Sequence, residues 1–354
     1  MTGFRFGTCL KKKYVNNNIM KAISLFSGCG GDAFGMIQAG VDVVGYNEIV
    51  DIFCETHDLN MPKCVRIGKD IQKTKKEDWE PYKNNIDLVI GGIPCQSFSN
   101  GGKKDPNDPR GKLYIDYMNM LRIVQPKYAI IENVKGLTTR KDTNGEKFFD
   151  KIIREFEYLG YTNIKHKVFH CEKYGVPQKR ERLIILATKG VDIPFPEETV
   201  ELSLKDIVFF NMKGAFQVPD EQFVNIPKEC ILTDMNNEET EGEFHPFARS
   251  QSVHGFSFGK RESPRHCEIV DIRKPTKTII CSYKFQPRLY VPLKNKNGCF
   301  LRPFMVDELK MIQGFPKSYK MAGTVEQQIS QLGNAIPPPL IKKIVEQIKG
   351  FDKS

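Results

Sequence analysis

The segment GGIPCQSFSNGG, over residues 91–102, contains a cysteine in a position that suits a reactive thiol. Cys95 follows the apolar run of residues 86–90 and precedes a loop rich in Ser, Asn, Gly and Lys. Only the thiolate is a good nucleophile, so a catalytic cysteine suits the point where a rigid strand meets solvent and substrate. A packing cysteine is the alternative, because buried free cysteine is common. Cys95 is therefore a candidate nucleophile that the rest of the chain must support.

A glycine-rich turn follows the first strand-like run and reads Ser-Gly-Cys-Gly-Gly-Asp over residues 27–32. Glycine lets the backbone approach a ligand closely, and such a turn at the carboxyl end of a strand suits a cofactor that carries a nucleoside. Glu48, after the next strand-like run, is placed to accept hydrogen bonds from ribose hydroxyls. Gly28, Gly30 and Ala33 also satisfy a GxGxxA dinucleotide pattern, so an NAD enzyme and a plain strand-to-helix turn both stay open.

An acidic residue is expected at the same sheet edge as Cys95 and the glycine turn. Glu132 and Asn133 follow the strand-like run of residues 128–131. A thiolate that attacks an electron-poor ring needs an acid beside it, which neutralises the charge that develops on the ring nitrogen. A glutamate with a purely structural role is the alternative.

Two arginines precede a further strand-like run. Arg180 and Arg182 share one face of an extended segment that leads into residues 183–186. Guanidinium groups so placed can clamp a carbonyl oxygen, a carboxylate or a phosphate. A solvated pair of charges is the alternative.

The elements that position these residues alternate along the chain. Strand-like runs at residues 41–46, 86–90, 128–132 and 183–188 alternate with helix-like stretches at residues 113–124 and 147–159. This alternation predicts an α/β fold, with a parallel sheet that carries helices on both faces. Beyond about residue 190 the pattern becomes irregular, and helical periodicity returns only at residues 306–312 and after residue 337. We expect a basic leader at residues 1–19, a first domain from residues 20–190 plus 303–354, and a second domain at residues 191–302.

Composition bounds the class of protein. The 354 residues carry a net charge of +10 and a pI near 9.0, which favours a polyanionic partner such as nucleic acid. The sequence has neither the ~18 consecutive apolar residues of a spanning helix nor the apolar core of a signal peptide, so we expect an intracellular protein with no membrane partner. The ten cysteines are scattered without a CxxC pair, and His166 and His170 fall in a strand-like run, so no metal site is predicted.

Several motifs, in order along the chain, resemble those of the cytosine-C5 DNA methyltransferases. They are AISLFSGCGGDAFGM from residue 22, Tyr46-Asn47-Glu48, Asp70, GGIPCQSFSNGG, Arg110-Gly111-Lys112-Leu113, ENVKG from residue 132, YGVPQKRERL from residue 174, Gln313-Gly314-Phe315-Pro316 and Gln331-Leu332-Gly333-Asn334. The resemblance covers residues 20–190 and about 302–345. It implies a Rossmann-like, S-adenosyl-methionine-dependent methyltransferase domain with a smaller, irregular target-recognition domain. Single-module forms of this kind occur in bacterial restriction-modification systems, phages and viruses.

The resemblance also implies a mechanism. Because C5 of cytosine is too weak a nucleophile to accept a methyl group, Cys95 would add to C6 and make C5 enamine-like. Glu132 would hold the protonated N3 and the exocyclic amine, and Asn133 would brace the loop. Arg182, with Arg180 behind it, would hold O2 and the Glu132 side chain. A base would then remove the C5 proton, and Cys95 would leave.

By the same resemblance, S-adenosyl-methionine would bind at the glycine turn. Phe26 would stack near the adenine, Glu48 would hold the ribose, and Asp70 would hold the adenine amine. The residues implied to line this pocket are Phe26, Gly28, Cys29, Gly30, Gly31, Glu48, Ile49, Asp70, Ile71, Pro94, Leu113, Asn334 and Ala335.

The implied substrate is double-stranded DNA, bound by a monomer. A base stacked in a duplex cannot reach a cysteine in a pocket, so the target nucleotide would be flipped out, at roughly a few kcal/mol. Residues 96–112 have the composition of a mobile lid that closes over the substrate. The lid residues expected to contact DNA are Gln96, Ser99, Lys103, Lys104 and Arg110. For the charged residues in this set, simple solvation is the alternative.

Residues 191–302 correspond in position to the family's target-recognition region, which reads the bases. The transfer-RNA-modifying branch of the family is an alternative, although the Cys-Phe-Thr that this branch carries is missing from the middle segment. An NAD dehydrogenase leaves the Pro-Cys-Gln, Glu-Asn-Val and Gln-Lys-Arg-Glu-Arg segments unexplained. A catalytically dead DNA-binding relative is disfavoured by the intact Cys95, Glu132 and Arg182. The expected location is the cytoplasm in a prokaryote, and the nucleus or a viral factory otherwise.

Overall fold

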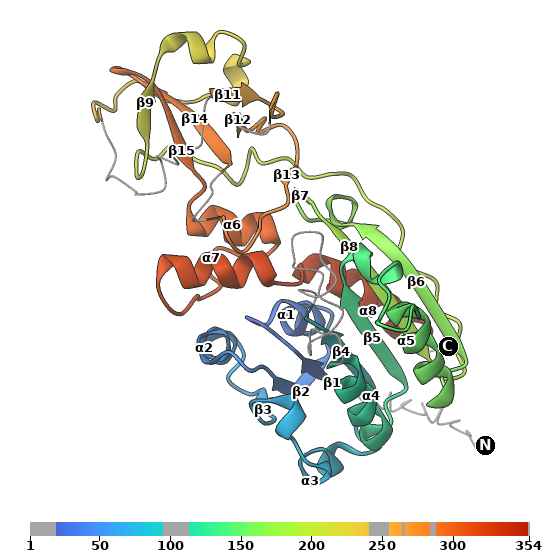
Figure 1. The fold of residues 1–354 in the computed structure, drawn as a ribbon. Helices are drawn as coiled ribbons and strands as arrows, with labels where there is room; N and C mark the ends of the chain where they lie inside the picture. The colour runs from blue at the N-terminus through green and yellow to red at the C-terminus, as the bar shows by residue number, and fades with distance from the viewer. Residues whose placement is uncertain (1–18, 95–112, 241–254, 264–265, 284–287, 353–354) are drawn as a thin grey trace, which may run out of the picture.

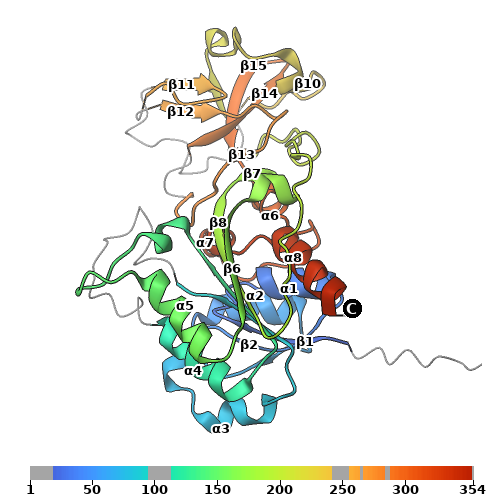
Figure 2. The same cartoon turned by 90° about the vertical axis from the view of Figure 1, so that its right-hand side faces the viewer.

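A computed structural model describes residues 19–94, 113–240, 255–263, 266–283 and 288–352. The ribbon has a large lobe, in which helices lie on both sides of a sheet, and a smaller lobe rich in strands (Figure 1). Helices α6 (Val306–Gln313) and α7 (Val325–Asn334) lie between the two lobes (Figures 1 and 2). Within the described part of the chain, no helix is long and apolar enough to cross a membrane.

Seven strands form the sheet of the large lobe, in the order β3-β2-β1-β4-β5-β8-β6. They are β1 (Lys21–Leu25), β2 (Asp42–Asn47), β3 (Val65–Arg66), β4 (Leu88–Gly92), β5 (Tyr128–Asn133), β6 (Asn163–His170) and β8 (Glu181–Thr188). The first five pair in parallel, whereas β8 runs antiparallel to both β5 and β6. The sheet therefore differs from the all-parallel expectation at one edge. Residues 171–180, which join β6 to β8, are too few for the crossover that a parallel pair needs.

Helices cover both faces of this sheet, as the sequence predicts. The helices of the large lobe are α1 (Gly31–Gln38), α2 (Asp51–Asn60), α3 (Lys76–Trp79), α4 (Leu113–Val124), α5 (Phe148–Tyr158) and α8 (Pro338–Asp352). Because successive side chains of a strand point to opposite faces, Ala22 and Leu88 belong to the core beneath α1 and α8, whereas Ile23 and Val89 belong to the core beneath α4 and α5. The C-terminal helix thus packs on the first strands, as we expected.

The smaller lobe is more ordered than the irregular sequence of residues 191–302 indicates. Five strands follow the order β11-β12-β14-β15-β9, and β10 pairs with β14. They are β9 (Phe216–Val218), β10 (Leu232–Asp234), β11 (Gly255–Phe258), β12 (His266–Ile269), β14 (Leu289–Asn295) and β15 (Gly298–Pro303). Most of these strands are only three or four residues long, so no periodic pattern develops that sequence inspection could detect. Two further short strands, β7 (Gln178–Lys179) and β13 (Thr276–Lys277), pair in parallel where the lobes meet.

A buried ion pair fastens the last strand of the small lobe to α6. Both side chains, Arg302 and Glu308, are 0% exposed, and the guanidinium contacts the carboxylate through two hydrogen bonds of 2.7 and 2.8 Å. Arg302 also donates to the carbonyl oxygen of Phe209, which belongs to the chain entering the small lobe. Two segments that connect the lobes are therefore held by one guanidinium.

We expect Glu308→Ala to lower the free energy of unfolding by about 3–5 kcal/mol, because it leaves the Arg302 charge buried without its carboxylate. Urea denaturation measures the change. The matched control is Glu346→Ala, which removes the surface pair between Lys342 and Glu346 and should cost less than about 1 kcal/mol. Equal losses in the two variants would contradict the structural role of the buried pair.

Candidate active site

The glycine turn joins β1 to α1 and presents backbone to open space. Gly28 and Gly30 have positive φ angles of +57° and +87°, which glycine adopts without strain. A Cβ added at Gly28 would meet no atom within 4 Å, so the turn is accessible there. A Cβ at Gly31 would lie 2.1 Å from the carbonyl oxygen of Ile336, so this glycine is required by close packing. The turn can admit a ligand at Gly28 while its far side is packed against the C-terminal segment.

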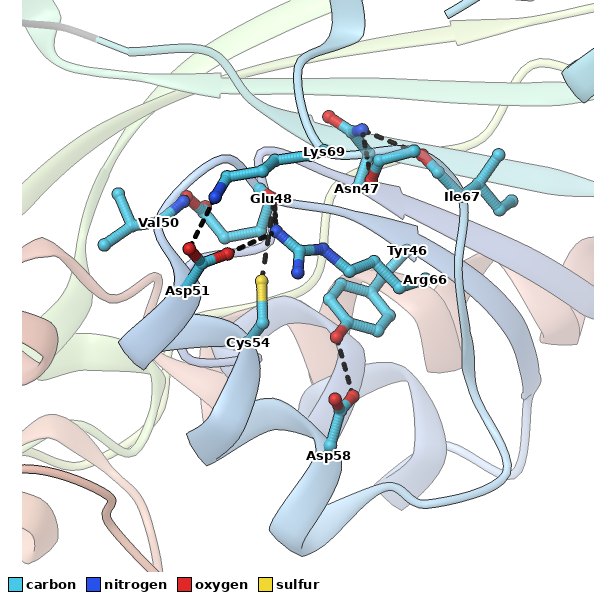
Figure 3. Close-up of polar contacts among 11 residues, drawn as sticks. Tyr46, Asn47, Glu48, Val50, Asp51, Cys54, Asp58, Arg66, Ile67 and Lys69 are labelled. Carbon is cyan, nitrogen blue, oxygen red and sulfur yellow. Dashed lines mark hydrogen bonds and ion pairs between the residues drawn. The ribbon is translucent and has the colours of Figure 1, made fainter.

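Glu48 follows β2 and is tied to the glycine turn. Its Oε2 accepts a hydrogen bond of 2.9 Å from the Gly28 amide, and its Oε1 accepts one of 2.9 Å from the Val50 amide. Figure 3 shows the polar contacts around Glu48, including the Arg66 guanidinium, which donates to the Glu48 carbonyl oxygen and pairs with Asp51. Burial raises the pKa of the Glu48 carboxyl. Each carboxylate oxygen keeps a second lone pair with which it can accept from a ligand hydroxyl.

A cavity of about 280 Å³ lies next to the residue that follows Glu48. Its lining includes Ile49, Gly68 and Asp70. The Ile49 side chain is 54% exposed, so its apolar surface is available to a ligand. Asp70 accepts from the Gln72 amide at 3.1 Å and so begins the short 3-10 helix that contains Ile71. These residues could hold the nucleoside part of a cofactor.

The remaining expected pocket residues do not line this cavity. Phe26 has a positive φ of 54° and is partly buried, as are Pro94 and Leu113. Asn334 is exposed at the end of α7, with its amide nitrogen bonded to the Ser330 carbonyl oxygen at 3.0 Å, and Ala335 is buried.

Glu132 lies at the end of β5 in a buried ion pair. Its Oε1 is 2.7 Å from Nε of Arg182, and the two side chains are 9% and 14% exposed. Burial raises the pKa of the Glu132 carboxyl, and the positive charges of Arg182 and Arg180 oppose this shift. A carboxyl whose pKa is raised keeps its proton to a higher pH, and in that form it can hydrogen-bond a ring nitrogen.

Asn133 braces the end of the neighbouring strand. Its amide nitrogen donates to the Ile93 carbonyl oxygen at 3.1 Å, and its side-chain oxygen accepts from the Val134 amide at 2.8 Å. Gly92 is paired with Glu132 across β4 and β5, so the backbone leading to Pro94 is fixed beside the carboxylate. The expected nucleophile and lid residues, Cys95, Gln96, Ser99, Lys103, Lys104 and Arg110, lie outside the described residues.

Arg180 occupies a different environment from Arg182. It is 1% exposed and donates to the carbonyl oxygens of Ile279 at 3.2 Å, Gly333 at 2.9 Å and Ala335 at 3.2 Å. These bonds join β7 and β8 to the end of the small lobe and to the segment after α7. The charge of Arg180 acts on Glu132 through space, while Arg182, two residues further along the chain, makes the direct contact.

Sequence reasoning missed two glutamines that reinforce this junction. Gln178 donates to Gln313 at 2.8 Å and accepts from the Ile279 amide at 2.8 Å. Gln313 in turn donates to the Ala335 carbonyl oxygen at 2.6 Å. Both glutamines stand in the motifs that carried the resemblance, but only the tertiary contacts reveal this function.

The sequence analysis assigns no function to Asp32 itself, although this residue ends the glycine-rich segment. The side chain is fully buried and accepts from the Ser24 hydroxyl at 2.6 Å and, more weakly, from the Ser27 hydroxyl at 3.5 Å. Burial raises the pKa of Asp32 to about 7. The carboxyl thus supports the start of the turn from inside the core.

Comparison with known proteins shows the family of this chain. The family model described as "C-5 cytosine-specific DNA methylase" matches residues 20–350. The chain belongs to this family. The family and the class of enzyme expected from the motifs, a DNA (cytosine-5-)-methyltransferase, are therefore confirmed, and the NAD dehydrogenase alternative loses its support.

Two bacterial methylases and one solved structure illustrate the relationship. Type II methyltransferase M.FnuDI of Fusobacterium nucleatum is 32% identical, with 93% of this chain and 94% of the relative covered. Type II methyltransferase M.NgoPII of Neisseria gonorrhoeae is 31% identical, with 94% and 96% covered. The crystal structure of a putative DNA modification methyltransferase encoded within an E. coli prophage matches with a TM-score of 0.69 at 21% identity, covering 95% of this chain and 100% of that one. This methylase fold confirms the expected Rossmann-like class.

The raised pKa of Asp32 predicts a pH dependence of stability. In the unfolded chain the carboxyl has an ordinary pKa near ~4. Between about pH 4 and pH 7 the folded protein therefore binds the extra proton, and the free energy of unfolding falls as pH rises, by up to about 1.4 kcal/mol per pH unit.

Asp32→Asn removes this ionisation, so relative to wild type the variant should gain stability between pH 5 and pH 8. Urea denaturation of both proteins at the two pH values measures the difference. Parallel pH profiles for the two proteins would show that Asp32 keeps an ordinary pKa in the folded state.

Proposed function

We propose that this protein transfers a methyl group from S-adenosyl-methionine to C5 of a flipped-out cytosine in a specific duplex DNA sequence, through a covalent bond between Cys95 and C6. The observation that carries the proposal is the buried pair of Glu132 and Arg182 beside the strand end that Asn133 braces. In sequence, Cys95 follows that strand end by three residues. The proposal therefore joins an acid and a cation at one edge of the sheet with a cysteine that follows the neighbouring strand in sequence.

The proposed chemistry uses each of these groups. The Cys95 thiolate adds to C6, and the electrons of the C5–C6 double bond become available at C5. Glu132, whose raised pKa favours its protonated form, hydrogen-bonds N3 and neutralises the charge that develops on the ring. Arg182 holds the Glu132 carboxyl in place and faces O2. Once C5 carries the methyl group and S-adenosyl-homocysteine is left as the other product, a base removes the C5 proton, the double bond re-forms, the C6–S bond breaks and the thiolate is released.

The residues at the glycine turn fit the cofactor. The open space at Gly28 admits the methionine part, the free lone pairs of Glu48 can accept from the ribose hydroxyls, and the cavity lined by Ile49 and Asp70 can receive the adenine. S-adenosyl-methionine supplies an electrophilic methyl group when it is bound. The protein's own contribution is to orient the cofactor relative to the strand edge that holds Glu132.

Cys95→Ser should abolish methyl transfer while duplex binding survives, because a serine hydroxyl is a far weaker nucleophile at neutral pH. Incorporation of labelled methyl groups into duplex DNA measures activity, and gel retardation measures binding. The matched control is Cys9→Ser, which changes a cysteine outside both the motifs and residues 191–302 and should leave activity unchanged. Undiminished activity of Cys95→Ser would overturn the mechanism.

Two further measurements sharpen the same test. DNA with 5-fluorocytosine at the target should form a complex with the wild type that survives denaturation, because fluorine blocks the last elimination. Transfer RNA, tested beside duplex DNA, separates the DNA-modifying function from the alternative branch of the family. Methylation of transfer RNA alone would replace the proposed substrate.

We also propose that residues 191–302 form the target-recognition domain. The sheet of this region is separate from the large sheet, and Glu132 and Arg182 lie outside it. The exposed cations Lys260 and Arg261 belong to the region, and base contacts and phosphate contacts both suit such groups. The bond from Arg180 reaches the region at a backbone carbonyl, that of Ile279, so a different sequence can preserve it.

Exchange of residues 191–302 for the equivalent segment of a family member with another target should transfer the target sequence without loss of the chemistry. Bisulfite sequencing of DNA from cells that express the chimera identifies the methylated sites, and the two parent enzymes are the controls. A folded, active chimera that still methylated the original site would place recognition in the lid or the leader instead.

A further inference from the structure

The glycine turn is contacted from the far end of the chain by a tyrosine hydroxyl. Tyr319 lies in the loop between α6 and α7, and its hydroxyl donates a hydrogen bond of 2.6 Å to the carbonyl oxygen of Cys29. The tyrosine is 2% exposed and Cys29 is 1% exposed. Burial raises the pKa of the Tyr319 hydroxyl well above its usual range, so the group remains a donor.

This hydrogen bond is made to the peptide group that precedes Gly30, whose backbone is conformationally free. The Cys29 carbonyl belongs to the peptide that precedes Gly30, whose left-handed conformation begins α1. Glycine populates several regions of φ and ψ, so a peptide next to it needs outside contacts to keep one orientation. On the opposite side, the Gly28 amide is held by Glu48. Besides the local bond of 2.9 Å from the Gly30 amide to the Ser27 carbonyl oxygen, the turn is therefore held at an amide by Glu48 and at a carbonyl by Tyr319.

The tyrosine is itself held rigidly, which lets it position the turn. Its ring packs edge-on against Phe34 at 5.1 Å and against Phe315 at 4.4 Å between ring centroids. Its carbonyl oxygen accepts from the buried Lys310 ammonium at 3.0 Å. The next residue, Lys320, is joined to the side-chain amide of Asn60 in α2: the Asn60 nitrogen donates to the Lys320 carbonyl oxygen at 2.8 Å, and the Lys320 amide donates to the Asn60 oxygen at 2.9 Å. The hydroxyl thus projects from a loop with little freedom to move.

We propose that Tyr319 is a positioning residue for the cofactor. Its hydroxyl holds the Cys29 carbonyl, and through it the backbone of residues 28–31, in the shape that accepts the methionine part of S-adenosyl-methionine. This inference rests on the proposed function, since it takes that cofactor as given. The site built from the first strand and helix is then incomplete without the segment that follows α6.

The test is Tyr319→Phe, which removes the hydroxyl and keeps the ring. Calorimetry on the full chain should show a dissociation constant for S-adenosyl-homocysteine about 3- to 10-fold higher than wild type, the range typical of one lost hydrogen bond. In steady-state assays the KM for S-adenosyl-methionine should rise by a similar factor. The kcat at saturating cofactor and the KM for DNA should stay close to wild type, a split that general loosening of the protein would not produce.

Two matched controls make the same substitution elsewhere. Tyr290→Phe removes a buried hydroxyl that has no hydrogen-bond partner among the residues that the structure describes. Tyr161→Phe removes a buried hydroxyl that donates to the Pro126 carbonyl oxygen at 3.1 Å, in the large lobe but away from the turn. Both variants should bind S-adenosyl-homocysteine as wild type does.

The possible results distinguish the positioning role of Tyr319 from the methyltransferase function. Wild-type affinity in Tyr319→Phe, or a fall in kcat with unchanged KM, would overturn the positioning role while the methyltransferase function stands. Equal weakening in Tyr161→Phe would assign the effect to general destabilisation and also overturn it. If the wild-type protein bound no S-adenosyl-homocysteine, the proposed cofactor would fail, and the inference with it.

Discussion

The parallel pairing of β1, β4 and β5 is the constraint on which the candidate site depends. Leu25 at the end of β1 is paired with Gly91, and Gly92 is paired with Glu132, so three strands end at one edge. Parallel strands that are covered on both faces by helices leave only their ends open to a ligand. Three features meet at this edge: the glycine turn, the end of β4 and the Glu132 carboxyl. Backbone hydrogen bonds between the strands set this register, so it does not depend on the loops.

Burial of charge at this edge gives the site its chemistry. Glu132 and Asp32 are both removed from water, and desolvation raises the pKa of each carboxyl. Arg182 opposes the shift at Glu132 through a direct contact, whereas Asp32 is supported by serine hydroxyls and not by a cation. The two carboxyls also repel each other, which adds to the raised pKa of Asp32. The fold therefore holds one carboxyl at the proposed substrate site and another where it supports the turn.

The segment after α6 completes the site from the opposite end of the chain. Ile336 packs against Gly31, Arg180 reaches the carbonyl oxygens of Gly333 and Ala335, and Tyr319 reaches that of Cys29. Contacts of such long sequence separation carry the entropic cost of closing a long loop, which the packing of the folded chain must offset. The same segment is joined to the small lobe by the buried pair at the start of α6. The orientation of the lobes and the shape of the cofactor turn are thus linked through one stretch of packed chain.

Local patterns were enough to predict the alternating strands and helices of the large lobe, the glycine turn, and the placement of Glu132 and Asn133 at a strand end. These features depend on neighbours within about 20 residues, through periodicity and turn chemistry. Sequence alone did not reveal that β8 is antiparallel, that short strands build a second sheet, or that Arg180 binds three distant carbonyls. Nor did it reveal the bond from Tyr319 to Cys29, whose partners are 290 residues apart. A side chain's type states what it can donate or accept, but only the packed fold decides which distant group lies within reach.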